Sequence, residues 1–153
     1  VLPQGRESTL PPLNSPLARV ARRLGYAWGL LGEEIDVLMA SCFLLEGGGK
    51  VVPTSLPEGV RNQAARVLTF MGTRWDGSGE PAASGERIPK ATRILQLAQR
   101  LVSRVRPGEG HPAHSLEETL GLIEAEAGSR FDPELVDLLL RLKNELGLED
   151  PAA

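Results

Sequence analysis

The stretch that decides the predicted fold runs from Thr73 to Leu95 and reads TRWDGSGEPAASGERIPKATRIL. Its first half is rich in glycine, serine and proline, the residues that favour turns. A helical pattern follows directly after Pro89, and proline is favoured at the start of a helix. The stretch therefore predicts a long ordered loop, W-D-G-S-G at its centre, that leads straight into a helix.

The residues on both sides of this stretch follow the three- and four-residue spacing of amphipathic helices. Capping residues, acidic residues and prolines mark where the helices begin. The expected helix starts are Ser15–Pro16, Glu33–Glu34, Pro57, Pro89, Ser115 with Glu118, and Asp132–Pro133. No strand-length run alternates with period two. The sequence therefore predicts an all-α fold, a single compact bundle of about six helices.

The ends of the chain differ in composition from this helical region. Residues 1–14 hold three prolines and no helical period, which predicts an extended arm or linker. Gly147 is a candidate C-cap for the last helix. We expect one domain over residues 15–147, a tail over 148–153, and, because no methionine starts the chain, a piece of a longer protein.

The overall composition excludes several classes of function. The chain has 153 residues and a net charge of −3, so no bulk basic charge favours nucleic acid. No apolar run reaches the roughly 18 residues of a membrane span. The single cysteine, Cys42, lies in an apolar run and is expected to pack as a small buried hydrophobe. With no secretion signal either, a cytoplasmic protein is the expectation.

The residues that carry catalytic chemistry are sparse. The two histidines, His111 and His114, share a Pro/Gly loop and are expected to be solvated surface residues rather than metal ligands. Lys50 follows three glycines that end a helix, although this segment could also hold an anion. We therefore expect no metal and no cofactor.

Arginines form a stripe on the helix after Pro89. Arg93, Arg100 and Arg104 are spaced seven and four residues apart and share one side of that helix. A solvated helix face is the leading interpretation, and a patch for a phosphate ligand or an acidic partner is the alternative.

The central stretch resembles the HD-GYP family, a branch of the HD-domain metal-dependent phosphohydrolases with the motif H-H-E-R-W-D-G-S-G-Y-P. Residues 127–136, AGSRFDPELV, are similar to the family's GTQFDPELV, and the likeness covers roughly residues 14–145. The matching residues of the central stretch are Arg74, Trp75, Asp76, Gly77, Ser78, Gly79, Pro81, Gly85, Glu86, Ile88, Pro89, Arg93, Ile94 and Leu95.

The resemblance implies an HD-domain-like bundle in which histidines and aspartates hold metal ions that hydrolyse cyclic di-GMP. This chain departs from that pattern at each metal-ligand position. The side chains of glycine, methionine, proline and valine do not ligate hard or borderline cations. The residues found at the family's ligand positions are Pro16, Glu46, Gly47, Met71, Gly72, Gln99 and Val102.

The central loop nevertheless keeps its family-like residues, which predicts a structural role. Glycines would supply tight turns, Trp75 would pack onto the helices, and Asp76 would accept hydrogen bonds from backbone N–H groups. The residues assigned to this structural loop are Arg74, Trp75, Asp76, Gly77, Gly79, Pro81, Ile88 and Pro89.

The leading hypothesis is a degenerate, non-catalytic HD-GYP-like module of a bacterial signalling protein, which contacts a protein partner or other domains of the same chain. The first alternative is a receptor for cyclic di-GMP or another nucleotide. For that receptor the resemblance assigns Lys50 and Arg106 to phosphate contacts, with Glu80 in place of a tyrosine at the ligand. The second alternative is a phosphohydrolase with a rebuilt site around His111, His114 and Glu80. A homodimer through the Leu-rich last helix is compatible with the leading hypothesis.

Overall fold

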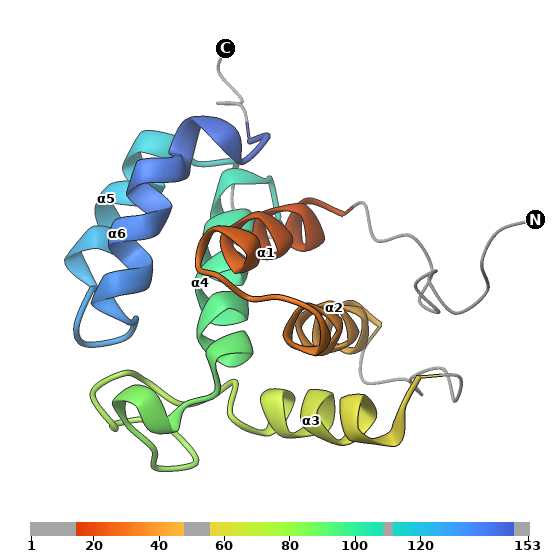
Figure 1. Cartoon of the computed structure of the whole chain (residues 1–153). Helices are drawn as coiled ribbons and strands as arrows, with labels where there is room; N and C mark the ends of the chain where they lie inside the picture. Colours follow the sequence, from red (N-terminus) through yellow and green to blue (C-terminus); the bar gives the residue numbers. More distant parts are fainter. Residues whose placement is uncertain (1–14, 48–55, 109–111, 149–153) are drawn as a thin grey trace, which may run out of the picture.

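The described residues of this computed structural model are 15–47, 56–108 and 112–148. They form six α-helices, so the predicted all-α bundle is confirmed (Figure 1). No strand occurs in these ranges, where an isolated bridge joins Ala127 and Phe131. The helices are α1 (Pro16–Ala27), α2 (Glu33–Glu46), α3 (Glu58–Thr69), α4 (Lys90–Val105), α5 (Leu116–Ala125) and α6 (Pro133–Leu142).

Helix α4 is the centre of the bundle. It packs against each of the other five α-helices, with α1, α2 and α3 on one side and the α5–α6 hairpin on the other (Figure 1). The apolar stripe predicted for this helix is buried, as expected from its spacing. The buried residues of this stripe are Ile94, Leu97, Ala98, Leu101 and Val105.

The helix starts follow the predicted capping residues. Ser15 and Ser115 each accept a hydrogen bond from the backbone N–H three residues on, at 3.1 and 3.0 Å. Asp132 accepts one from the N–H of Glu134 at 2.9 Å. Such caps each stabilise a helix by about 1 kcal/mol. Local sequence signals therefore place these helix starts correctly.

Two helix ends differ from the prediction. The helical spacing from Leu17 to Leu24 extends to Trp28 and predicts it on the first helix, but Trp28 follows α1, because Gly29 adopts a φ of 95° and turns the chain away. The last helix was expected to continue to Gly147, but α6 ends at Leu142 and tightens into a 3₁₀ turn over Lys143–Glu145. Such turns are common at the C-termini of α-helices.

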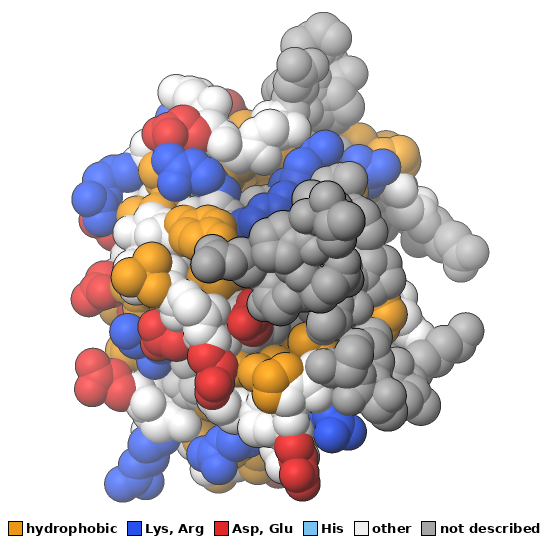
Figure 2. All heavy atoms as spheres, turned by 45° about the vertical axis from the view of Figure 1, so that its right-hand side comes forward, with side chains coloured by type: hydrophobic (Ala, Val, Ile, Leu, Met, Phe, Trp, Pro, Cys, Tyr) orange, Lys and Arg blue, Asp and Glu red, His pale blue; other side chains and the backbone are white. Residues whose placement is uncertain are grey.

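The core is mainly aliphatic, and Cys42 is fully buried in it, as predicted. Figure 2 shows acidic and basic side chains mixed over the visible face, in keeping with the small net charge. No helix in the described ranges is both apolar enough and long enough to cross a bilayer. The predicted arm over residues 1–14 and the glycine-rich segment with Lys50 lie outside the described residues, as does the tail except for Leu148.

Candidate functional site

The W-D-G-S-G loop, residues 73–89, joins α4 to the turn between α5 and α6. The backbone N–H groups of Trp75 and Asp76 donate to the carbonyl oxygens of Arg130 and Ser129, at 3.2 and 2.9 Å. On the other side, the amide of Gln96 on α4 donates to the carbonyl oxygen of Thr73 at 2.8 Å. The loop therefore fixes the position of the α5–α6 hairpin relative to α4.

The loop has an ordered internal structure. Asp76 Oδ1 accepts a hydrogen bond from the backbone N–H of Ser78 at 2.9 Å, and donation from Ser78 lowers the pKa of this carboxyl group. Gly77 has a φ of 87°, which favours glycine. A Cβ at Gly79 would collide with the carbonyl oxygen of Gly72. These turns and close approaches need the residue types that the sequence carries.

The other residues assigned to the loop lie at different depths. Arg74 and Pro81 are exposed, and Trp75 is half-buried. Ile88 is fully buried, and Pro89 immediately precedes α4 as its N-cap. The first half of the loop therefore lies at the surface, whereas its end is packed into the protein.

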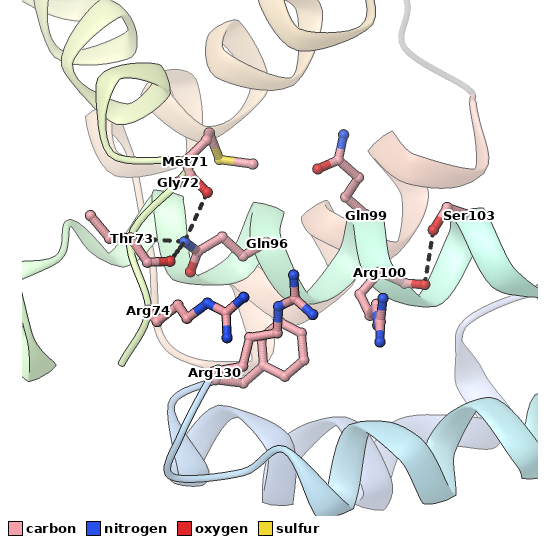
Figure 3. Close-up of a pocket in the computed structure, with 10 residues that line it drawn as sticks. Met71, Gly72, Thr73, Arg74, Gln96, Gln99, Arg100, Ser103 and Arg130 are labelled. Atoms are coloured by element: carbon pink, nitrogen blue, oxygen red, sulfur yellow. Dashed lines mark hydrogen bonds between the residues drawn. The ribbon is translucent and has the colours of Figure 1, made fainter. Parts of the chain in front are cut away.

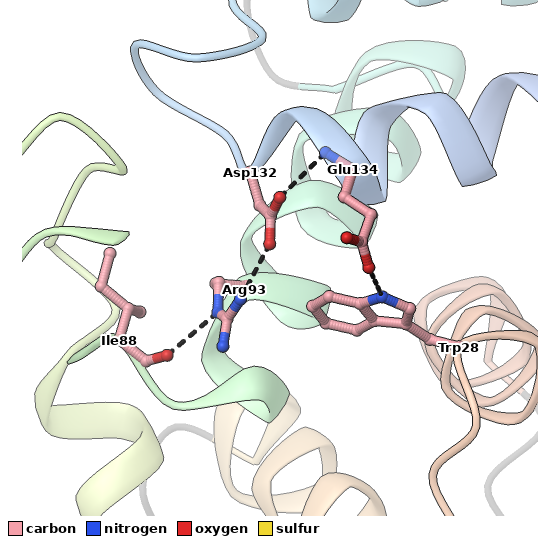
Figure 4. Close-up of polar contacts among 5 residues, drawn as sticks. All are labelled: Trp28, Ile88, Arg93, Asp132 and Glu134. Atoms are coloured by element: carbon pink, nitrogen blue, oxygen red, sulfur yellow. Dashed lines mark hydrogen bonds and ion pairs between the residues drawn. The ribbon is translucent and has the colours of Figure 1, made fainter. Parts of the chain in front are cut away.

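A buried ion pair lies beside this loop (Figure 4). Arg93 Nη1 contacts Asp132 Oδ2 at 2.8 Å, and Arg93 Nε donates to the carbonyl oxygen of Ile88 at 2.9 Å. The prediction that Arg93 lies on a solvated face is therefore wrong. The reason is tertiary, because the N-terminus of α6 covers this part of α4 and supplies the carboxylate.

Two tryptophans enclose this ion pair. The Arg93 guanidinium lies 5.2 Å from the ring centre of Trp28 and 5.8 Å from that of Trp75, within cation–π range. The indole Nε1 of Trp28 donates to Glu134 at 2.7 Å (Figure 4). This cluster connects the end of α1, the W-D-G-S-G loop, α4 and the start of α6.

A cavity of about 380 Å³ opens between the loop, α4 and the α5–α6 turn (Figure 3). We call it the arginine cavity because three arginines line it. Its lining residues are Met71, Gly72, Thr73, Arg74, Gln96, Gln99, Arg100, Ser103, Arg130 and Phe131.

The three arginines of the cavity come from three different segments. Arg74 belongs to the loop, Arg100 to α4 and Arg130 to the α5–α6 turn, and Figure 3 shows all three at the same opening. Glu126 bridges two of them, since its carboxylate lies 3.3 Å from Arg100 and 3.3 Å from Arg130. The Nε of Arg100 is buried and has no hydrogen-bond partner among the described residues.

The arginine cavity also contains residues at positions where the family resemblance implies metal ligands. Met71, Gly72 and Gln99 stand where the family resemblance places metal ligands, and all three line the arginine cavity. Glu46, at another such position, accepts a hydrogen bond from Ser15 Oγ at 2.6 Å and does not line this cavity. A thioether, a glycine and an amide among arginines do not fit a dinuclear metal centre.

The placement of the possible ligand side chains also argues against a metal centre of this kind. Within residues 15–47, 56–108 and 112–148, no group of three or more His, Cys, Asp or Glu side chains is placed to hold a metal ion. The residues present therefore do not fit the metal centre that the resemblance implies.

Of the other predicted site residues, the structure describes Glu80, Arg106 and His114. Glu80 is exposed and its backbone N–H donates to Gly72, whereas Arg106 is exposed at the far end of α4. His114 lies at the start of α5, 3.9 Å from Glu118. Lys50 and His111 lie outside the described residues.

Sequence reasoning missed two cavity residues, Gln96 and Arg130. Arg130 lies in the AGSRF turn, where nothing in the local pattern marks it as functional. The stripe on α4 did indicate Arg100, although as part of a solvated face. The spacing of Arg100 from other basic residues in the sequence could not reveal that the loop, α4 and the α5–α6 turn converge at one cavity.

Residues 49–135 match the HD domain family, which is more than half of the chain. The chain belongs to the HD domain family. It is 39% identical over 79 residues to 3′3′-cGAMP-specific phosphodiesterase 3 of Vibrio cholerae, covering 51% of this chain and 16% of the relative. It is 35% identical over 74 residues to a cyclic di-GMP phosphodiesterase of Thermotoga maritima, covering 48% and 20%. These matches span a fifth or less of the curated relatives' length.

The fold also matches a solved structure. A crystal structure of a cyclic GMP-AMP specific phosphodiesterase of V. cholerae superposes with a TM-score of 0.59 at 21% identity. The match covers 85% of this chain and 43% of that one. The described helices therefore share the fold of this solved structure.

Proposed function

We propose that this HD domain is a non-catalytic regulatory or interaction module of a bacterial signalling protein. The observation that carries the proposal is the arginine cavity, which is lined by Met71, Gly72 and Gln99 at positions where the family resemblance implies metal ligands. The curated relatives are several times longer than the region that matches this chain. This difference supports the proposal that the domain belongs to a longer signalling protein. Other domains of that chain, a separate protein or a second copy would be the partners, and the cytoplasm is the proposed location.

The chemical reason for the lack of catalysis is the missing nucleophile. In metal-dependent hydrolysis the metal lowers the pKa of bound water from about 15.7 to about 7. Guanidinium groups carry positive charge, but they do not coordinate and deprotonate water in this way. The intact W-D-G-S-G loop would then maintain the shape of the domain rather than a reaction centre.

The test is metal analysis combined with a hydrolysis assay. The purified chain is incubated with Mn²⁺, Fe²⁺ or Zn²⁺, desalted, analysed for metal, and then incubated with cyclic di-GMP. The T. maritima relative, treated identically, is the positive control. We expect substoichiometric metal and no hydrolysis, and two tightly held metals per chain would overturn the proposal.

A second candidate function is a nucleotide receptor that does not hydrolyse its ligand. The relatives' names, which refer to cGAMP and cyclic di-GMP, and the basic lining of the cavity favour it. Calorimetry with cyclic di-GMP tests this candidate. Micromolar affinity that is lost in Arg100→Ala supports binding in the arginine cavity. Micromolar affinity that is lost in Lys50→Ala or Arg106→Ala instead supports binding by the residues that the resemblance assigns, and the absence of heat rejects the receptor.

A further inference from the structure

We propose that the arginine cavity binds the phosphate group of a small phosphate monoester, held by Arg74, Arg100 and Arg130. This inference deepens the proposed function and rests on it, because it assigns a ligand class to the cavity that lacks a metal centre. The phosphate would be bound by guanidinium groups alone. The three arginines were not grouped by the sequence, and only the fold brings them to one opening (Figure 3).

Two of the three arginines, Arg100 and Arg130, are held in place before any ligand arrives. Glu126 contacts both Arg100 and Arg130, which restricts the orientation of these two side chains. The backbone of Arg130 is itself fixed, since its carbonyl oxygen accepts from the N–H of Trp75 at 3.2 Å. Because less side-chain freedom is lost on binding, such pre-organisation favours affinity.

The arginines also retain unused hydrogen-bonding capacity. Within the described part of the chain, the Nε of Arg100 has no acceptor, and the guanidinium of Arg74 makes no hydrogen bond or ion pair. A guanidinium presents several N–H groups in a planar fork that matches the oxygens of a phosphate. A phosphate at the opening would supply acceptors for the guanidinium of Arg74.

The balance of charge favours a dianion. Glu126 forms ion pairs with Arg100 and Arg130. Arg74 interacts with Asp76, whose pKa is lowered mainly by hydrogen bonds from Ser78 and to a smaller extent by Arg74. Positive charge therefore remains in excess at the opening. A phosphate monoester carries up to two negative charges near neutral pH, whereas a diester carries one, so the monoester gains more from this excess.

The size and lining of the cavity indicate that the ligand is more than inorganic phosphate. A volume of about 380 Å³ falls in the range of small-molecule sites. Met71 and Phe131 supply apolar surface beside the arginines, and Gln99 supplies an amide for a polar substituent. An organic group attached to the phosphate would occupy this part of the cavity.

The test uses phenyl phosphate as the monoester probe, with inorganic phosphate and the diester dimethyl phosphate for comparison. Binding is measured by calorimetry and by NMR shifts in EDTA at constant ionic strength. We expect saturable binding of phenyl phosphate, weaker binding of inorganic phosphate, and the weakest binding of dimethyl phosphate. Because a hydrogen bond to a charged group contributes about 1.5–3 kcal/mol, Arg74→Gln and Arg130→Gln should each weaken binding at least about tenfold.

The matched control is Arg141→Gln, which removes an exposed arginine of α6 that pairs with Asp137 outside the cavity. It should leave phosphate binding unchanged. Circular dichroism establishes that each variant is folded, and Arg74, which is exposed, provides the variant least able to disturb the fold. Absence of saturable binding, unchanged affinity in both cavity variants, or an equal loss in the control would overturn the inference.

The two proposals fail separately. Arginine-dependent binding of phenyl phosphate in EDTA, together with a functional metal centre in the metal assay, would reject the proposed function and retain the phosphate site. Absence of both phosphate binding and metal would reject only the phosphate site.

Discussion

The buried ion pair between Arg93 and Asp132 offers the sharpest test of how the fold is held together. The change is Asp132→Asn, which removes the negative charge. Asparagine caps helices as well as aspartate does, so the start of α6 should be preserved. The variant therefore isolates the loss of the counter-ion from the loss of the cap.

The expected magnitude follows from burial. The side chains of Arg93 and Asp132 are only 8% and 4% exposed, so the arginine would be left as an uncompensated buried charge. Breaking such a pair costs about 3–5 kcal/mol. Arg93 keeps its bond to Ile88 and its contacts with two tryptophan rings, which places the expected cost near 3 kcal/mol. For a domain of this size, the melting temperature should fall by about 6–12 °C.

Urea unfolding at pH 7, followed by circular dichroism, measures this loss. The control is Asp137→Asn, which breaks an exposed pair with side chains 66% and 69% exposed and should cost at most about 0.5 kcal/mol. The double variant Arg93→Met/Asp132→Asn removes both charges and should recover part of the lost stability. A loss below about 1 kcal/mol in Asp132→Asn would refute the reasoning.

Three further predictions concern other parts of the fold. Burial, and secondarily Glu46, raise the pKa of Cys42 to about 12, so iodoacetamide at pH 8 should label it only after unfolding, as mass spectrometry would detect. Because the pKa of the Cys42 thiol is higher in the folded than in the unfolded chain, burial of the protonated thiol contributes fully to the free energy of unfolding below about pH 9. This contribution is lost as the pH rises towards 12. Gly79→Ala should lower the melting temperature by several degrees, because its Cβ would meet backbone atoms, whereas Gly121→Ala in α5 has open space and should stabilise by about 0.5–1 kcal/mol. Ser115→Ala should cost about 1 kcal/mol in urea unfolding through loss of the α5 cap.

Each of these predictions has a result that contradicts it. Rapid labelling of the folded thiol would show that Cys42 is accessible. Equal melting temperatures for the two alanine variants would show that the loop tolerates a side chain at Gly79. An unchanged urea midpoint for Ser115→Ala would show that the cap contributes nothing.

The sequence by itself determined the helices and where they begin. The signals at Ser15, Ser115 and Asp132 act within a few residues, because a capping side chain reaches only the N–H groups of its own helix. The glycine at position 77 could be anticipated for the same reason, since its positive φ belongs to a local turn. The need for glycine at position 79 comes instead from the approach of the Gly72 backbone. The family resemblance added the order of the elements and the positions at which it implies metal ligands.

Only the tertiary structure decided which face of α4 meets which partner. Arg93 and Arg100 share a stripe in the sequence, yet one is buried against Asp132 and the other lines an open cavity with Arg74 and Arg130. Helical spacing shows that residues lie on one side of a helix, but not what covers that side. The α5–α6 hairpin packs against α4 through contacts between distant parts of the chain, and this packing creates both the buried ion pair and the arginine cavity.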